Sequence, residues 1–391
     1  MATISCGSRF LSIRCFSIEL NSFGSFLYYF LHFRIKKMLD RLTDLAIGNV
    51  ISNAINIGNR LNIFKAIAEI SNEENPVLPE QIAAKAGCKE RYVREWCNTL
   101  ACGNILEVNE KEEFWISKEN VEALTNTSFQ LMFHTMLPTV LRPIDSLIEC
   151  FKKDGPYGLD YSIYSDFEDM QAMFTKTVYE QHMISGLIPA FGNGIKEKLE
   201  DGGFRVLDVG CGEGFHSCLL AENYSKSQFV GLDICEKAIK SAKLNKKSDG
   251  SDFQNLEFVV GDAMIMPEDW TGCFDLVAFF GSLHDLLRPD LSLLEVHRVL
   301  KPGGMVVLTE SDGTSNVFQD REAFGKMSAL QYGGSMLHCL PVGSNSSDAM
   351  GYGSMWGRKR ATELMTKCGF KDIEITPIIH FPGSVFYVLK K

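Results

Sequence analysis

One stretch constrains the fold of this chain more than any other: the segment FRVLDVGCGEGFH at residues 204–216. An apolar run ends there in the carboxylate of Asp208, and three alternating glycines follow it, Gly210, Gly212 and Gly214. Glycine lets a backbone turn sharply and approach a ligand closely. The segment therefore predicts a buried strand, a ligand-binding loop and a helix in direct succession.

The same rhythm of strand, loop and helix repeats through the rest of the chain. Apolar segments that predict strands cover residues 205–209, 228–234, 256–262, 274–280, 304–310, 373–379 and 385–391. Helical segments separate the first five, which is typical of a parallel sheet covered on both faces. The last two lie close together and predict an antiparallel hairpin. The expected fold class is α/β, a doubly wound, mostly parallel sheet of seven strands.

The acids around the glycine loop indicate the charge of its ligand. A dinucleotide site favours G-x-G-x-x-G, with a pyrophosphate on the helix N-terminus. Here the third glycine comes one residue early, and Asp208 and Glu213 flank the loop. Two carboxylates would repel a pyrophosphate, whereas they would attract an ammonium or a sulfonium.

Two further strands also end in acids. Asp233 ends the second strand, where a carboxylate can accept both hydroxyls of a ribose. Asp262 follows the third, where it could accept a hydrogen bond from an exocyclic amine while the Ala263 N–H faces an adenine ring nitrogen. Together with Asp208, these residues predict a nucleoside ligand that carries positive charge.

The chain resembles the class I methyltransferases that use S-adenosylmethionine. VLDVGCGEG matches their glycine signature, GLDI their ribose-binding acid, VVGDA their adenine-binding turn, and FDLVAFFGSLHDL and VLKPGG their fourth strand and the turn into the fifth. The resemblance implies a Rossmann-like fold, S-adenosyl-L-methionine as cofactor, and its methionine end near Asp208 and Gly210. The expected cofactor-binding residues are Asp208, Gly210, Gly212, Gly214, Asp233, Ile234, Asp262, Ala263 and Phe280.

The segment before this domain has the layout of a winged helix. Helices are expected at 79–86 and 90–101, and strands at 105–108 and 114–116. One interpretation is DNA binding through Lys89, Arg91 and Arg94 on the second helix. The favoured interpretation is a packing and dimerisation module, because acids are interleaved with these residues and crowd the hairpin tip. It resembles the N-terminal dimerisation domain of some small-molecule methyltransferases, which implies a homodimer.

Four segments are expected along the chain. Residues 1–37 form an extension, disordered, transit-like or a start-site artefact; 38–125 a winged-helix-like domain; 126–198 a helical connector and lid; and 199–391 the cofactor-binding domain. No segment is apolar over the length of a membrane span. The expected location is the cytoplasm, or the mitochondrion if the extension is a transit peptide. The net charge of −10 argues against nucleic acid as a partner.

Methyl transfer needs an aligned nucleophile and, for an alcohol or phenol, often a base. His284 in FFGSLHDLL is the candidate base, at a position that related methyltransferases also fill with histidine. The alternative is that it caps the following helix or packs against the cofactor. The insertion at residues 324–357, after the fifth strand, is expected to form the acceptor lid, and the candidate acceptor-facing residues are Tyr179, His182, Tyr332, His338 and Trp356. The twelve cysteines include no C-x-x-C pair, so no metal is expected and Cys339 is taken as a buried or incidental thiol.

The predicted function is methyl transfer from S-adenosylmethionine to oxygen or sulfur of a small molecule. One alternative is a protein or nucleic-acid methyltransferase, although FFGSLHDL stands where amino-group methyltransferases carry an asparagine–proline motif. The other is a regulator that binds the cofactor and uses its winged helix on DNA.

Overall fold

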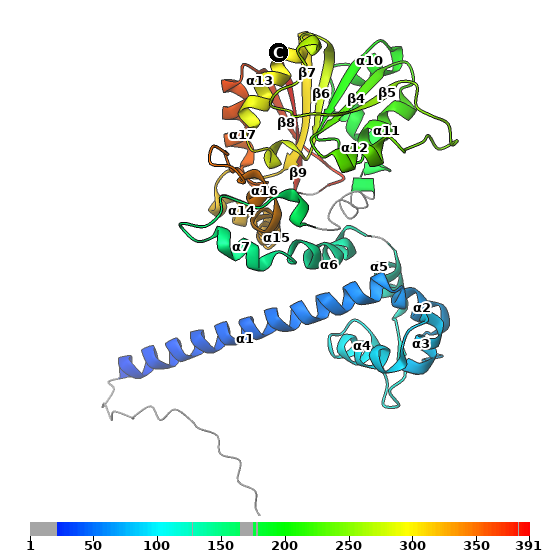
Figure 1. Cartoon of the computed structure of the whole chain (residues 1–391). Helices are drawn as coiled ribbons and strands as arrows, with labels where there is room; N and C mark the ends of the chain where they lie inside the picture. Colours follow the sequence, from blue (N-terminus) through cyan, green and yellow to red (C-terminus); the bar gives the residue numbers. More distant parts are fainter. Residues whose placement is uncertain (1–21, 127, 165–174, 177–178, 382) are drawn as a thin grey trace, which may run out of the picture. The chain divides into compact units, whose positions relative to one another are not determined.

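The computed structural model of the chain describes residues 22–126, 128–164, 175–176, 179–381 and 383–391. The chain forms two compact units, Met1–Lys118 and Glu119–Lys391 (Figure 1). The first 21 residues of the predicted extension lie outside the described residues. The other residues of that extension belong to a helix, α1 (Ser22–Arg60), so the expected boundary at 37 and 38 falls within one continuous element.

The first unit has the expected helices and hairpin. After α1 come α2 (Ile63–Ile70), α3 (Pro79–Ala86), α4 (Glu90–Cys102), β1 (Glu107–Val108) and β2 (Phe114–Trp115). Proline at the first position of α3 and a left-handed Gly87 after its last position explain where this helix begins and ends. The indole of Trp96 on α4 donates to the Ala54 carbonyl at 2.8 Å, which ties α4 to α1.

The second unit begins with helices that precede the sheet. They are η1 (Lys118–Asn120), which spans the boundary, α5 (Val121–Thr125), α6 (Phe129–Val140), α7 (Ile144–Cys150), η2 (Tyr161–Ile163), η3 (Met183–Leu187), α9 (Ile188–Ala190) and α10 (Ile195–Asp201). They correspond to the mostly helical character that the sequence predicts for this region. Parts of the predicted connector, residues 165–174 and 177–178, lie outside the described residues.

A seven-stranded sheet organises the second unit and confirms the predicted fold class. Its order is β5-β4-β3-β6-β7-β9-β8. The strands are β3 (Arg205–Val209), β4 (Gln228–Asp233), β5 (Leu256–Val260), β6 (Phe274–Phe280), β7 (Leu300–Ser311), β8 (Lys371–Pro377) and β9 (Ser384–Lys390). The first five pair in parallel, and β9 pairs antiparallel with both β7 and β8. The strand order reverses at β3, which is where open α/β sheets bind ligands.

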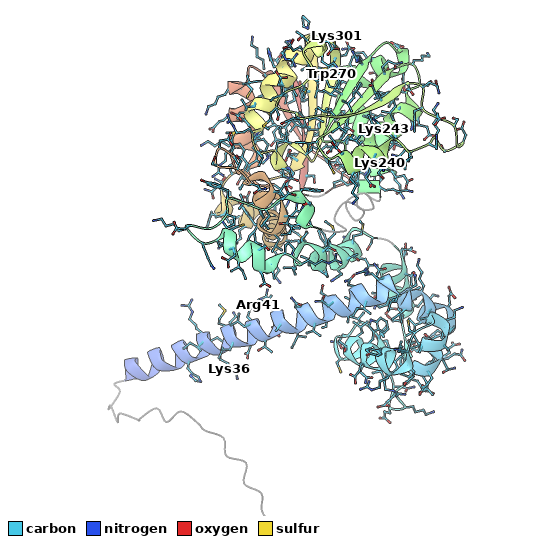
Figure 2. All side chains as sticks on the ribbon, viewed as in Figure 1. Lys36, Arg41, Lys240, Lys243, Trp270 and Lys301 are labelled. Carbon is cyan, nitrogen blue, oxygen red and sulfur yellow. The ribbon has the colours of Figure 1, made fainter. Side chains whose placement is uncertain are left out.

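Helices cover both faces of this sheet (Figure 1). Buried residues of α13 (Pro289–Val299) and α17 (Gly357–Lys367) join one core cluster, which also includes Trp270 of η4 (Glu268–Trp270) (Figure 2). Residues of α10 and α11 (Phe215–Asn223) join the other. The remaining helix between strands is α12 (Glu236–Ala242). Because helices cover both faces, the ends of the strands are the parts of the sheet that a ligand can reach.

The segment after the fifth strand, which includes the acceptor lid predicted at residues 324–357, is helical. It contains α14 (Val317–Phe324), α15 (Met327–Gly334), η6 (Ser335–Cys339) and α16 (Leu340–Gly343). The turn η6 has π-helical geometry, which is rare and occurs mostly at functional sites. Among the described residues, no helix combines the length and apolar character needed to cross a membrane.

Candidate active site

The glycine loop joins β3 to α11 in a conformation that needs glycine. Gly210, Gly212 and Gly214 have φ values of 72°, 54° and 81°. A Cβ on Gly214 would lie 2.3 Å from the Phe258 ring, so this glycine also permits close packing. The Gly210 N–H donates to the Leu232 carbonyl at 2.8 Å, which fixes the loop against β4.

Asp208 is a buried carboxylate beneath this loop. Its Oδ2 accepts a hydrogen bond from Ser217 Oγ at 2.6 Å. Its Oδ1 is buried and has no hydrogen-bond partner among the residues that the structure describes. Burial raises the pKa of Asp208 to about 7, and the nearby charge of Asp233 adds to this, although the Ser217 bond opposes it. A buried acid with one free oxygen fits the ammonium group of the expected cofactor.

The other two acids lie at the ends of neighbouring strands. Asp233 ends β4, and its two oxygens accept hydrogen bonds from the Gly212 N–H at 2.8 Å and the Cys235 N–H at 2.9 Å. Asp262 follows β5 and accepts from the Met264 N–H at 2.8 Å. Because β3, β4 and β5 are adjacent and parallel, the three acids share one edge of the sheet. The residues present therefore fit a positively charged nucleoside.

The remaining residues of the predicted cofactor set differ in exposure. Ile234, directly after Asp233, is 70% exposed, so its side chain presents an apolar surface to an incoming ligand. Ala263 is buried. Phe280 ends β6 and stacks on the ring of His216, with centroids 4.4 Å apart. Burial lowers the pKa of His216 to about 3, so this imidazole is neutral and contributes packing against Phe280 rather than charge.

His284 lies in the turn η5 (Leu283–Asp285), directly after β6. This turn packs on the glycine loop, because Ser282 Oγ donates to the Val209 carbonyl at 2.6 Å. A Cβ on Gly210 would lie 2.6 Å from Ser282 Cβ. His284 is itself buried. The predicted base thus sits beside the predicted cofactor loop.

Glu310, near the end of β7, orients this imidazole. Its Oε2 lies 2.6 Å from His284 Nδ1 and also accepts from the Trp356 indole at 3.3 Å. Burial would lower the pKa of His284, but the charges of Glu310 and Asp285 outweigh it and raise that pKa well above the ordinary value. Sequence reasoning missed Glu310. The available signal was an acid ending a predicted parallel strand, the criterion that identified Asp233.

Two more reactive groups face the other ring nitrogen of His284. Asp285 Oδ1 lies 3.3 Å from Nε2. One ligand atom from each of His284, Asp285 and Cys339 lies within 4.8 Å of the other two. Cys339 ends η6, so the lid region contributes directly to this cluster.

The predicted acceptor residues lie in several environments. His338 is buried, and the Tyr164 ring packs against it with centroids 4.7 Å apart. Tyr179 lies next to the strand end, with its hydroxyl 3.3 Å from Thr309 Oγ1. Tyr332 donates to Asp320 at 2.7 Å. His182 stacks on His380 with centroids 4.1 Å apart. Of the five, Trp356 bonds directly to the Glu310 side chain that orients His284.

Comparisons with known proteins agree with the division into a winged-helix unit and a methyltransferase domain. A methyltransferase domain model matches residues 200–348, and a model described as an Rv2258c-like winged helix-turn-helix domain matches residues 49–126. The demethylmenaquinone methyltransferase of Lactococcus lactis is 32% identical over 151 residues, covering 38% of this chain and 56% of the relative, about half of that enzyme's length. The protein-lysine N-methyltransferase efm4 of Schizosaccharomyces pombe is 30% identical over 185 residues, covering 43% of this chain and 76% of the relative.

Solved structures share the fold over almost the whole chain. Human N-acetylserotonin methyltransferase, solved in complex with S-adenosylmethionine, superposes with a TM-score of 0.61 at 16% identity, covering 90% of this chain and 97% of that one. The mitomycin 7-O-methyltransferase MmcR superposes with a TM-score of 0.64 at 13% identity, covering 92% and 99%.

The sheet order, the glycine loop and the three strand-end acids are typical of Rossmann-like folds that bind nucleosides. The chain belongs to the class I S-adenosylmethionine-dependent methyltransferases, with a winged-helix domain at its N-terminal side. Its cofactor is S-adenosyl-L-methionine, which confirms the prediction from the sequence.

Proposed function

We propose that the chain transfers a methyl group to a hydroxyl oxygen of a small molecule and uses His284 as the general base. The observation that carries this proposal is the buried pair of His284 and Glu310 beside the glycine loop, with 2.6 Å between Nδ1 and Oε2. The similarity in fold to an O-methyltransferase supports the choice of oxygen. Sulfur remains the second candidate, because a thiol ionises closer to neutral pH and needs a base less.

The chemistry divides between cofactor and protein. When bound, the cofactor supplies a methyl group already activated on a sulfonium. Asp208 and Asp233 hold the positively charged nucleoside at the ends of β3 and β4. The Nε2 atom of neutral His284 takes the proton from the acceptor hydroxyl, while Glu310 holds the Nδ1 proton and stabilises the imidazolium that forms. Because the pKa of His284 is raised well above its ordinary value, the share of this neutral form, and with it the rate, should grow as the pH rises through that pKa. The indole of Trp356 holds the Glu310 carboxylate in place at 3.3 Å.

The acceptor is proposed to be small for two reasons. The base is buried, so the reacting atom must enter the interior of the unit rather than dock on its surface. The chain is also acidic, with a net charge of −10, which disfavours a polyanionic substrate. The name of the yeast relative gives a protein lysine as the substrate of that enzyme. A protein acceptor of this chain would need to present an extended side chain to the interior of the unit.

A panel of phenols, alcohols, carboxylic acids and small thiols tests the proposal, with S-adenosylhomocysteine formation as the readout. With the best hydroxyl acceptor, His284→Asn should lower the rate at least tenfold, within the usual contribution of a general base. Glu310→Gln should lower it by a smaller factor, because the amide still accepts a hydrogen bond but loses the charge. His297→Gln, a half-buried histidine on α13, is the matched control. An unchanged rate in His284→Asn would remove the base assignment.

A further inference from the structure

The imidazole of His284, the carboxylate of Asp285 and the thiol of Cys339 lie close together. Their ligand atoms all lie within 4.8 Å of one another, and His284 Nε2 is 3.3 Å from Asp285 Oδ1. In a tetrahedral zinc site, nitrogen and oxygen ligands lie about 2.0–2.1 Å from the metal, which places them about 3.3 Å from each other. The spacing of this pair is therefore already that of one edge of a zinc tetrahedron.

The groups around these atoms also suit a metal. Glu310 Oε2 lies 2.6 Å from His284 Nδ1, the ring nitrogen that faces away from Asp285. A carboxylate in this position orients metal-binding imidazoles in many proteins. Asp285 Oδ1 is buried, accepts no well-formed hydrogen bond among the residues that the structure describes, and lies 3.3 Å from His284 Nε2, with which it forms an ion pair when the imidazole is protonated. A buried carboxylate oxygen needs a cation or a donor, and a bound metal would take the place of that proton between the two side chains. The Glu310 contact is independent of the spacing.

We propose that His284, Asp285 and Cys339 form a binding site for a divalent transition metal, with zinc as its occupant. One nitrogen, one oxygen and one sulfur ligand suit zinc, whereas magnesium and calcium prefer sets made of oxygen alone. Three protein ligands leave a fourth tetrahedral position open, as in catalytic rather than structural zinc sites. The metal would replace the thiol proton of Cys339 and any proton on His284 Nε2.

The site overlaps the proposed catalytic base, which has a consequence for activity. A metal bound to His284 Nε2 occupies the lone pair that would accept the proton from an acceptor hydroxyl. Zinc should therefore inhibit the transfer that depends on His284, and a chelator should restore it. This consequence rests on the proposed function, whereas metal binding itself does not.

Cobalt substitution tests the site without any methyl acceptor. The chelator-treated full chain should bind one equivalent of Co²⁺ and develop both visible bands of tetrahedral cobalt and a near-ultraviolet thiolate-to-cobalt band, which one equivalent of Zn²⁺ abolishes. Cys339→Ser should lose the thiolate band, and Asp285→Asn should weaken zinc binding at least tenfold in equilibrium dialysis, since the loss of a ligand costs at least as much as the loss of a group that orients one. Cys368→Ser, a buried cysteine that contacts the Asp290 carbonyl, should behave like the wild type.

The outcomes separate the two proposals. Failure of the wild type to bind cobalt or zinc, or a thiolate band that persists in Cys339→Ser, would overturn the metal site. If zinc binds as expected but the chelated protein methylates no hydroxyl acceptor, the metal site stands and the proposed function fails. Thermal unfolding of each variant without metal checks that a lost signal reflects the missing ligand rather than a lost fold.

Discussion

Burial raises the pKa of Asp208, so that binding of a positively charged ligand should change the ionisation of this carboxylate. Its pKa of about 7 follows mainly from burial, because the carboxylate lies under the glycine loop with one oxygen bonded to Ser217. This pKa lies above that of the unfolded chain, so the group's contribution to folding stability is complete below about pH 4 and is lost as pH rises towards 7. A positively charged ligand should reverse this preference by favouring the ionised form.

We therefore expect the affinity for S-adenosylmethionine to rise with pH and to level off above about pH 7. The slope below that point should approach tenfold per pH unit, since one proton leaves Asp208 on binding. Calorimetry at pH 6 in buffers of different ionisation enthalpy should detect the released proton. Asp208→Asn should bind more weakly and lose the pH dependence. Equal affinity of the wild-type protein at pH 5.5 and 7.5 would contradict the role of Asp208.

Asp233 offers a second test among the cofactor acids. Asp233→Ala should abolish cofactor binding measurable by calorimetry, because it removes the ribose acceptor and also the bond from the Gly212 N–H. Asp275→Asn is a suitable control, since this acid binds Lys301 and the Arg205 N–H at the start of β3. Binding by Asp233→Ala at wild-type strength would refute the ribose assignment.

At the scale of elements, the winged helix has the shape of a DNA reader but not its electrostatics. Arg94 on α4 contacts Glu80 at 2.7 Å and Glu90 at 2.6 Å. Arg91 on the same helix pairs with Glu95. Charges that are already paired with acids are poorly available to neutralise phosphates. The positive charges of Arg91 and Arg94 on α4, the helix that would enter a major groove, are thus neutralised by nearby acids.

We expect this protein to leave mixed-sequence duplex DNA unretarded in an electrophoretic shift assay at physiological salt, with and without cofactor. Glu80→Gln combined with Glu90→Gln should increase weak binding at low salt, because the double change releases Arg94. Specific retardation of DNA by the wild-type protein at physiological salt would instead favour the regulator alternative.

At the scale of the whole molecule, α1 carries a row of exposed apolar side chains. Ile35, Met38, Leu42 and Leu45 follow a three–four spacing and are each more than half exposed. Spacing of this kind is typical of a helix that packs against another helix. We propose that α1 packs against a second copy of the chain, as the resemblance to dimeric methyltransferases implies.

Sedimentation velocity should show a dimer. Leu42→Glu combined with Leu45→Glu should shift the protein to a monomer, because the change buries charge in the helix contact. Thr43→Glu with Ile47→Glu adds the same charge on another face of α1 and should leave the dimer intact. A monomeric wild-type protein at micromolar concentration would contradict the proposal.

The sequence alone determined the sheet and a positively charged nucleoside as ligand, and its resemblance to a known family implied which cofactor this is. Apolar strands that alternate with helices predict a doubly wound sheet, and the strand-end residues Asp208, Asp233 and Asp262 follow each other in the chain as neighbouring strands do in space. These features are local, since a carboxylate at a strand end is placed by that strand itself. Periodicity and spacing therefore suffice to predict them.

Only the tertiary structure decided what surrounds His284. Glu310 comes from β7, Cys339 from the lid and Trp356 from the start of α17, and no spacing in the sequence indicates that they share one imidazole. The sequence predicted an incidental thiol at Cys339 because it lacks a nearby cysteine, but folding brings it to an acid and a histidine from another segment. Such a cluster depends on packing between distant segments, and packing is the property that a linear pattern does not encode.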